Sequence, residues 1–196
     1  MSDQPLTLDP AATALVLIDL QQGIVARDTA PHASAAVVAN AVRLADAFRA
    51  AGALVVLVHV DFAPDRRDML NPPRDETPPV PASSPDWADI VPALGPRPGD
   101  VVITKRQWGA FYGTGLDLQL RRRGIRTLVL GGIATNYGVE STARDGWERG
   151  YALVLAEDAT STFAAEAHAL ALKYVFPRIA RVRSTDDVLA ALGASS

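Results

Sequence analysis

Two side chains of opposite charge follow predicted strands at positions from which they could transfer a proton. Asp19 comes directly after the apolar run Ala14–Ile18, and Lys105 follows the run Val101–Thr104. A carboxyl group beside a buried strand loses hydration, which raises its pKa, whereas a nearby ammonium group opposes that shift. Together the two groups would form a pair suited to general acid–base catalysis. Taken singly, Asp19 could equally cap a turn and Lys105 could lie on the surface, so the hypothesis depends on their joint placement.

A third polar segment follows another apolar run. The residues Gly131-Gly132-Ile133-Ala134-Thr135 come at the end of the run that begins at Thr127 and lead into a predicted helix. In an open parallel sheet, ligands bind at the carboxyl ends of the strands, near the place where the strand order reverses. We therefore expect this segment to share one edge of a sheet with Asp19 and Lys105.

Alternating apolar runs and helical patterns predict the fold that must position these residues. Short, nearly continuous apolar runs are typical of strands buried on both faces of a parallel sheet. Gly52, Gly124 and Gly150 each follow a segment with helical spacing, where a left-handed cap is expected. The pattern predicts an α/β domain with a mostly parallel sheet and helices on both faces. The expected strands are Ala14–Ile18, Leu54–Val60, Val101–Thr104, Thr127–Leu130, Ala152–Ala156 and Ile179–Val182, and the expected helices are Ala36–Ala50, Leu116–Arg123, Tyr137–Arg149, Ala164–Val175 and Thr185–Leu192.

A proline-rich segment interrupts this alternation. Ten of the fourteen prolines lie from Pro64 to Pro98, including Pro72-Pro73 and Pro78-Pro79. Such a segment supplies few backbone donors, so it predicts an irregular excursion between two strands. A loop of this length serves as a lid, a binding loop or an interface arm, or else as a plain surface insertion. Trp87 favours a docked loop, because a large aromatic side chain tends to be buried.

Length and charge exclude several classes of protein. The 196 residues suit a single domain over 1–196, and the net charge is −3. The one tight basic run, Arg121 to Arg123, ends a predicted helix and does not indicate a nucleic-acid interface. The N-terminal residues lack the basic start of a signal peptide, and the longest uncharged stretch, from Thr29 to Val42, is too short to span a membrane. We expect a cytoplasmic protein that acts on a small molecule, without nucleic-acid or membrane partners.

The chain contains no cysteine, which removes one large class of mechanism. No disulfide can form, and a reducing compartment is compatible with that composition. Any reaction that needs a protein thiolate as nucleophile is excluded.

Three motifs together resemble the isochorismatase-like (cysteine hydrolase) family. They read Leu-Ile-Asp19-Leu-Gln21, Ile-Thr-Lys105-Arg and Gly-Ile-Ala-Thr135-Asn-Tyr-Gly138-Val-Glu140-Ser-Thr142-Ala-Arg. The similarity runs in register from about Ala11 to Ala190 and is weakest in the proline-rich segment. It implies a three-layer αβα fold with a six-stranded parallel, Rossmann-like sheet in the order 3-2-1-4-5-6. It also implies association into homo-oligomers.

The resemblance also implies roles for individual residues. The family has a catalytic triad of Asp, Lys and Cys, which corresponds here to Asp19, Lys105 and, at the nucleophile position, Gly138. A non-proline cis peptide bond is expected between Ile133 and Ala134. It would direct the backbone amides of Ala134 and Gly138 toward one point, where they could bind an oxyanion or a carboxylate.

Glycine at the nucleophile position changes the expected reaction. Amidohydrolases of this family form a thioester at the cysteine, and Thr135, Ser141 and Thr142 are poor substitutes because no base is evident beside them. Isochorismatases can carry glycine there, and they hydrolyse a vinyl ether without a covalent intermediate. By this resemblance Asp19 is the general acid, Lys105 orients it and binds a substrate carboxylate, and the glycine leaves room. Two alternatives remain: a pseudoenzyme that only binds its ligand, and an amide or ester hydrolase that uses water activated by Asp19.

Further side chains near the motifs are candidates for binding the substrate. Those expected to contact it are Gln21, Trp108, Ala134, Thr135 and Tyr137. Arg106 is either a carboxylate clamp or an exposed side chain. Phe111 is expected in the core and Tyr112 as a loop anchor, and Thr142, Arg144 and Asp145 are expected to pack and to form ion pairs on a helix.

No metal or other cofactor is expected. Nicotinamidase-like members of the family bind a metal after the second strand through an Asp followed two residues later by a His. This chain has Asp61 and then Ala63 at those positions, so the first His is missing. His32, His59 and His168 have no ligand spacing relative to one another or to a second ligand, which favours structural roles.

Overall fold

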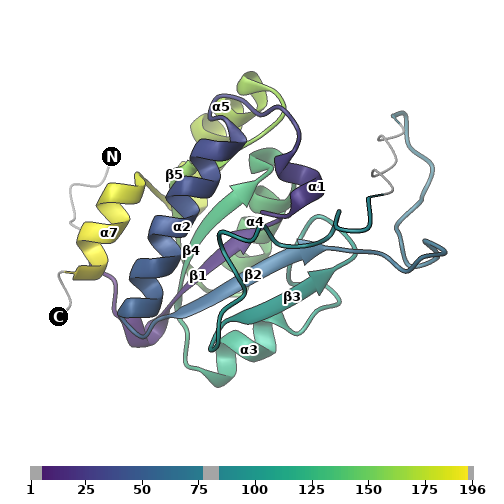
Figure 1. The fold of residues 1–196 in the computed structure, drawn as a ribbon. Helices are drawn as coiled ribbons and strands as arrows, with labels where there is room; N and C mark the ends of the chain where they lie inside the picture. Colours follow the sequence, from purple (N-terminus) through teal and green to yellow (C-terminus); the bar gives the residue numbers. More distant parts are fainter. Residues whose placement is uncertain (1–5, 77–83, 194–196) are drawn as a thin grey trace.

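The computed structural model describes residues 6–76 and 84–193, and they form a six-stranded sheet with helices on both faces (Figure 1). All of the strand pairs are parallel, and the strand order is β3-β2-β1-β4-β5-β6. The expected fold class and strand order are therefore confirmed. The strands are β1 (Thr13–Ile18), β2 (Leu54–Val60), β3 (Val101–Lys105), β4 (Thr127–Ile133), β5 (Ala152–Ser161) and β6 (Arg181–Arg183).

Two hydrophobic cores, one on each face of the sheet, hold the helices in place. In β1, Leu15 and Leu17 point into one core, whereas Val16 and Ile18 point into the other, as the two-residue period of a strand requires. The first core contains buried residues of α2 (Ser34–Ala50) and α7 (Thr185–Gly193), which lie side by side in Figure 1. The second core contains residues of α3 (Leu116–Arg122), α4 (Glu140–Glu148), α5 (Ala165–Tyr174) and α6 (Phe176–Ile179). The remaining short elements are η1 (Pro10–Ala12), α1 (Gln22–Val25) and the π-helical turn η2 (Thr135–Val139).

Several element boundaries differ from the sequence-based expectation, and β4 also continues to Ile133, three residues beyond its expected end. The expected strand from Ile179 was wrong at its start, because the short helix α6 occupies Phe176–Ile179 and β6 begins at Arg181. β5 continues to Ser161, five residues beyond its apolar run, through Glu157 and Asp158. The helix expected from Tyr137 is preceded by a π-helical turn, η2, and becomes α-helical at Glu140.

The glycines that follow α2, α3 and α4 have the left-handed conformation expected of helix caps. Gly52, Gly124 and Gly150 have φ values of 69°, 68° and 83°. In each case the glycine amide or the next one bonds back to the last turn of the helix, for example from Ala53 N to Phe48 O at 2.9 Å.

The proline-rich segment between β2 and β3 is irregular, as expected. Residues 64–76 and 84–98 contain turns and one isolated bridge, between Ile90 and Gln21, but no helix or strand. Pro78-Pro79 lie outside the described residues. The Trp87 ring stacks on Phe62 with ring centroids 6.5 Å apart, so this part of the loop is docked on the domain. Among the helices that the structure describes, none has both the length and the apolar character needed to cross a bilayer.

Candidate active site

Asp19 and Lys105 meet at the carboxyl edge of the sheet. Asp19 follows β1 and Lys105 ends β3, two strands away, and the Lys105 Nζ atom lies 2.7 Å from Asp19 Oδ2. Lys105 also donates a hydrogen bond to the Gln107 carbonyl at 3.0 Å. The two residues are only 5% and 2% exposed. The expected convergence of carboxyl and ammonium groups is therefore present in the structure.

The backbone of Asp19 is turned away from the strand direction. Its φ is 53°, one of two positive values at non-glycine residues within the described part of the chain. Aspartate tolerates this left-handed region better than most residues with a side chain. The amide of Asp19 still donates to the Val58 carbonyl at 2.8 Å, so the residue remains tied to β2 while its side chain reaches Lys105.

The two carboxyl oxygens of Asp19 have different surroundings. Oδ2 accepts the hydrogen bond from Lys105, whereas Oδ1 is buried and has no hydrogen-bond partner among the described residues. Burial raises the pKa of the Asp19 carboxyl above its usual range, although the Lys105 ammonium opposes this shift. The ammonium therefore holds one oxygen of the carboxyl group, and the other oxygen is without a partner among the described residues.

Gly138 lies directly against this pair. A Cβ atom at position 138 would lie 2.9 Å from Ile18 Cγ2, 3.1 Å from Asp19 Oδ2 and 3.4 Å from the Trp108 carbonyl oxygen. The first distance is shorter than side chains normally allow. The structure thus refines the expectation that glycine leaves an open hollow: its immediate effect is to let η2 approach Asp19 closely.

The turn that leads to Gly138 has the expected backbone geometry. The peptide bond between Ile133 and Ala134 is cis, which confirms the expectation. The carbonyl of Ala134 accepts from the amides of Tyr137 and Val139 at 3.1 and 3.2 Å, and this closes the turn. Both Ala134, which precedes η2, and Gly138, which lies within it beside Asp19, are buried. The use of their amides as an anion site stays a prediction.

Trp108 and Tyr137 form an aromatic edge beside the site. Their ring centroids are 4.9 Å apart in an edge-to-face arrangement, and the residues are 62% and 39% exposed. Trp108 contributes its carbonyl to the surroundings of Gly138, so the aromatic edge adjoins Asp19. Exposed aromatic rings next to a buried acid are suited to covering a flat or cyclic ligand.

Gln21, an expected substrate contact, uses its side chain for hydrogen bonds within the protein. Its side chain is fully buried and bonds Val60 through both groups of the amide: Oε1 accepts from Val60 N at 2.9 Å, and Nε2 donates to Val60 O at 3.0 Å. The second hydrogen of Nε2 goes to the Trp87 carbonyl at 3.1 Å. Because both amide hydrogens are used within the protein, Gln21 fastens the proline-rich segment to the end of β2.

Thr135 also uses its side chain within the protein. The residue is fully buried, and its Oγ1 lies 2.8 Å from Nδ1 of His168. Its expected contact with substrate is therefore restricted to backbone atoms. This hydrogen bond connects η2 to α5, on the side of the turn that faces away from Lys105.

The secondary candidates largely have structural roles. Phe111 is buried as expected, but Tyr112 is exposed, so its ring is not the expected loop anchor. Arg106 pairs with Asp68 of the proline-rich segment, with 2.5 Å between Nε and Oδ2. Thr142 donates to the Gly138 carbonyl at 2.6 Å, and Arg144 and Asp145 form ion pairs along α4 with Glu140 and Arg149. The packing and pairing roles expected of these three α4 residues are present.

The metal site of nicotinamidase-like relatives has no counterpart after β2. Asp61 accepts a hydrogen bond from the amide of Phe62, and Ala63 offers no ligand atom. His59, at the end of β2, uses both ring nitrogens, with Nδ1 2.8 Å from Ala88 O and Nε2 2.8 Å from Thr104 Oγ1. These residues do not fit a metal ion, and His59 has the structural role that we expected.

The other two histidines correct the sequence-based expectation that all three are isolated. His32 and His168 both approach one carboxylate oxygen of Glu157. Their positions, 136 residues apart in the sequence, gave no recognisable ligand spacing. Although burial alone would raise it, the hydrogen bonds from the two histidines lower the pKa of Glu157. Sequence reasoning missed Glu157 because it assigned no strand beyond Ala156, and it also missed Ser161, whose buried Oγ has no partner among the described residues.

Comparison with known sequences shows the family to which this chain belongs. Residues 13–187 match the sequence model of the isochorismatase domain. The isochorismatase family protein YecD of Escherichia coli O157:H7 is 51% identical over 187 residues, which cover 95% of this chain and 100% of that protein. The ureidoacrylate amidohydrolase RutB of Methylorubrum extorquens (strain DM4) is 36% identical, with 80% of this chain and 73% of that protein covered.

Solved structures give the same result. An isochorismatase family protein from Burkholderia thailandensis superposes with a TM-score of 0.92 at 48% identity and covers 97% of this chain and 100% of its own. N-carbamoylsarcosine amidase from Thermoplasma acidophilum superposes with a TM-score of 0.71 at 28% identity, covering 89% of this chain and 96% of its own.

Proposed function

Because the chain belongs to the isochorismatase family of hydrolases, we propose that it hydrolyses the vinyl ether of a small carboxylated substrate, with Asp19 as the general acid. The observation that carries the proposal is the pairing of Asp19 with Lys105 through one oxygen only. The partnerless Oδ1 is the atom from which a proton would leave. The absence of cysteine makes a thiol-independent reaction necessary.

The reaction balances without a covalent intermediate. The protonated carboxyl of Asp19 delivers its proton to the terminal carbon of the enol, which leaves an oxocarbenium ion and an Asp19 carboxylate. Water adds to the cationic carbon and returns a proton to the carboxylate. The resulting hemiketal then breaks its bond to the alcohol, which releases the alcohol and an α-keto acid. Such proton transfer by a positioned side chain typically contributes about 100- to 10,000-fold to the rate.

The surroundings of Asp19 support this assignment. Lys105 has three N–H donors, of which Asp19 and Gln107 use two, so one remains for a substrate carboxylate. After proton delivery the ammonium also stabilises the Asp19 carboxylate. The aromatic edge of Trp108 and Tyr137 would cover a ring attached to the ether oxygen.

A second candidate function is amide hydrolysis by water that Asp19 activates as a general base. The similarity to ureidoacrylate amidohydrolase and to N-carbamoylsarcosine amidase favours it. The two functions need opposite protonation states of one carboxyl. General acid catalysis declines as pH rises through the pKa of Asp19, whereas general base catalysis increases.

The test is turnover of isochorismate, measured as pyruvate release over a range of pH, beside ammonia release from ureidoacrylate and N-carbamoylsarcosine. We expect pyruvate release that declines toward alkaline pH and falls at least about 100-fold in Asp19→Asn. Asp28→Asn, which alters an exposed aspartate, is the matched control and should keep full activity. Ammonia release that increases with pH would establish the second candidate instead. Melting shifts with these compounds but no turnover would show a binding protein without catalysis.

A further inference from the structure

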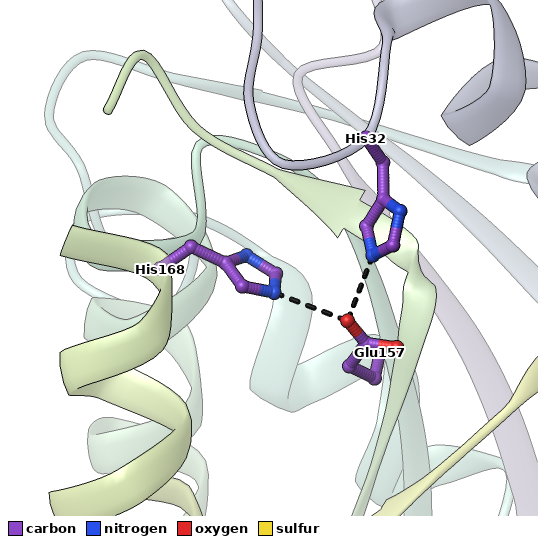
Figure 2. Close-up of side chains that lie close together, drawn as sticks. All are labelled: His32, Glu157 and His168. Atoms are coloured by element: carbon purple, nitrogen blue, oxygen red, sulfur yellow. Dashed lines mark hydrogen bonds and ion pairs between the residues drawn. The ribbon is translucent and has the colours of Figure 1, made fainter. Parts of the chain in front are cut away.

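Three side chains that the proposed reaction does not use converge on the far side of η2 from Lys105. His32 lies on the loop before α2, Glu157 on β5 and His168 on α5, and Figure 2 shows both imidazole rings pointing at one carboxylate oxygen. Within residues 6–76 and 84–193, these side chains make the one group of three or more His, Cys, Asp or Glu residues with ligand atoms close enough to share an ion.

We propose that His32, Glu157 and His168 bind a divalent transition-metal ion, for which Zn²⁺ is the appropriate probe. Two imidazole nitrogens and one carboxylate oxygen are a donor set that Zn²⁺ accepts, with a remaining position for water. The site is separate from the family's metal position after β2, whose residues do not fit an ion here. It takes no part in the reaction proposed for Asp19.

The ligand atoms lie close enough together to share an ion after small side-chain movements. Tetrahedral coordination with bonds of about 2.0–2.2 Å places neighbouring ligand atoms roughly 3.3–3.6 Å apart. Glu157 Oε1 lies 2.7 Å from His32 Nε2 and 3.3 Å from His168 Nε2, and all three atoms lie within 4.8 Å of one another. The two rings stand edge to face at 83°, with centroids 5.7 Å apart. Side-chain adjustments of about an ångström would complete the geometry.

A hydrogen bond to Thr135 holds the His168 ring in the orientation that a metal-binding histidine needs. Nδ1 of His168 lies 2.8 Å from Thr135 Oγ1, so with a metal on Nε2 the Nδ1 proton would be donated to that hydroxyl. Outer hydrogen bonds of this kind fix the tautomer and the ring orientation of metal-binding histidines. Thr135 opens η2, which connects the proposed ion to the turn that carries Gly138.

The burial of the three residues is also suited to an exchangeable ion. His168 is 2% exposed, whereas the side chains of His32 and Glu157 are each 31% exposed. One side of the group is therefore shielded by protein and the other is accessible from solvent. Because His32 is 125 residues from Glu157 in the sequence and His168 is 11 residues beyond it, bound metal would join the loop before α2 to β5 and α5.

The experiment uses the untagged chain, stripped with a chelator and titrated with Zn²⁺ by calorimetry, with metal content measured after dialysis. We expect one Zn²⁺ per chain and a melting temperature higher by roughly 5 °C or more when free Zn²⁺ is about 100 times its Kd. His32→Gln and Glu157→Gln, both at partly exposed positions, should each weaken binding more than about 100-fold. Thr135→Val should weaken it about 10- to 100-fold by removing the outer hydrogen bond.

His59→Gln is the matched control, because this histidine lies outside the group, and it should bind Zn²⁺ with unchanged affinity. A chain that takes up no stoichiometric Zn²⁺, or one whose binding survives both His32→Gln and Glu157→Gln, would overturn the proposal. The three side chains would then form a purely hydrogen-bonded clamp. Neither result bears on the Asp19 reaction, since metal content and calorimetry are read without substrate.

Discussion

At the scale of single residues, the pairing of Asp19 with Lys105 is better explained by chemistry than by stability. Removing two charges from water costs several kcal/mol for each ion. The attraction between the two charges often does no more than offset this cost, so a buried ion pair adds little to the stability of the folded state. Here the ammonium contacts one carboxyl oxygen and leaves the other without a partner. A side-chain arrangement chosen for stability would satisfy both oxygens.

Lys105→Met is expected to move the pH dependence of pyruvate release. Burial raises the pKa of Asp19 and Lys105 lowers it, so removal of the ammonium leaves the raising effect unopposed. A general acid works while protonated, and the alkaline decline in kcat should therefore shift to higher pH. The pH profile of kcat measures this shift. Lys173→Met, at the exposed second lysine of the chain, is the control, and an alkaline limb that moves to lower pH would contradict the assignment.

Gly138→Ala should be harmful although it adds one methyl group. The new Cβ would press on Ile18 and on the Asp19 carboxyl, so we expect a loss of about 1–3 kcal/mol in the free energy of unfolding and a clear fall in kcat. Urea denaturation and turnover measure the two effects. Gly115→Ala, where a Cβ meets nothing within 4 Å, is the matched control. Equal stability of the two variants would refute the tight approach of η2.

Some residues of the two candidate sites could be predicted from the sequence and others could not. Asp19 and Lys105 were predictable because each follows a recognisable apolar run, and a parallel sheet brings such ends together. The hydrogen bonds of Gln21 were not predictable because its partners, Val60 and Trp87, come from segments 39 and 66 residues away. The approach of His32 to Glu157 depends on β5 continuing through polar residues, which its hydrophobic pattern does not reveal.

At the scale of elements, the described part of the proline-rich segment near Trp87 is held by backbone and side-chain contacts to the residues after β1 and β2, and not by a helix or strand of its own. Gln21 binds the Trp87 carbonyl, the amides of Gln22 and Gly23 donate to Asp89 and Trp87, and Phe62 stacks on the Trp87 ring. Element types were predictable where the hydrophobic period was long and glycine marked the end, as in α2. The types of α6 and β6 were harder to predict, because elements of four and three residues are too short to show a hydrophobic period.

Gln21→Leu is expected to release this segment. The substitution keeps the volume but leaves Val60 N and the Trp87 carbonyl without their bonds from the side chain, which should lower the free energy of unfolding by about 2 kcal/mol. Limited proteolysis should then cut within residues 64–98 faster than in the parent chain. Gln22→Leu, one residue along, is the control. Identical digestion patterns for both variants would show that the segment is held by other contacts.

At the scale of the whole molecule, apolar side chains remain on the outer surfaces of the helices. Trp147 on α4, and Leu170 and Tyr174 on α5, are each about half exposed. Large exposed apolar groups of this kind mark surfaces for association. We propose that copies of the chain associate in solution, in keeping with the oligomer expected from the sequence resemblance.

Light scattering coupled to size-exclusion chromatography tests this association. We expect a mass that is a multiple of the 20.8 kDa of one chain and that persists on dilution into the low micromolar range. Trp147→Glu and Leu170→Glu should shift the mass toward that of one chain, whereas Glu148→Gln, at an exposed position of α4, should not. A mass of one chain for the unmodified protein at all concentrations would refute association.

The positive φ of Asp19 governs how position 19 should be mutated. In the left-handed region most residues with a Cβ lose about 1–2 kcal/mol, and asparagine loses less because its short polar side chain bonds locally. An alanine or valine there would combine a conformational penalty with the loss of the acid. In a saturation library at this codon, β-branched replacements would drop out through poor folding alone. Only the asparagine and glycine members of such a library would therefore report on proton transfer with the backbone kept in its native conformation.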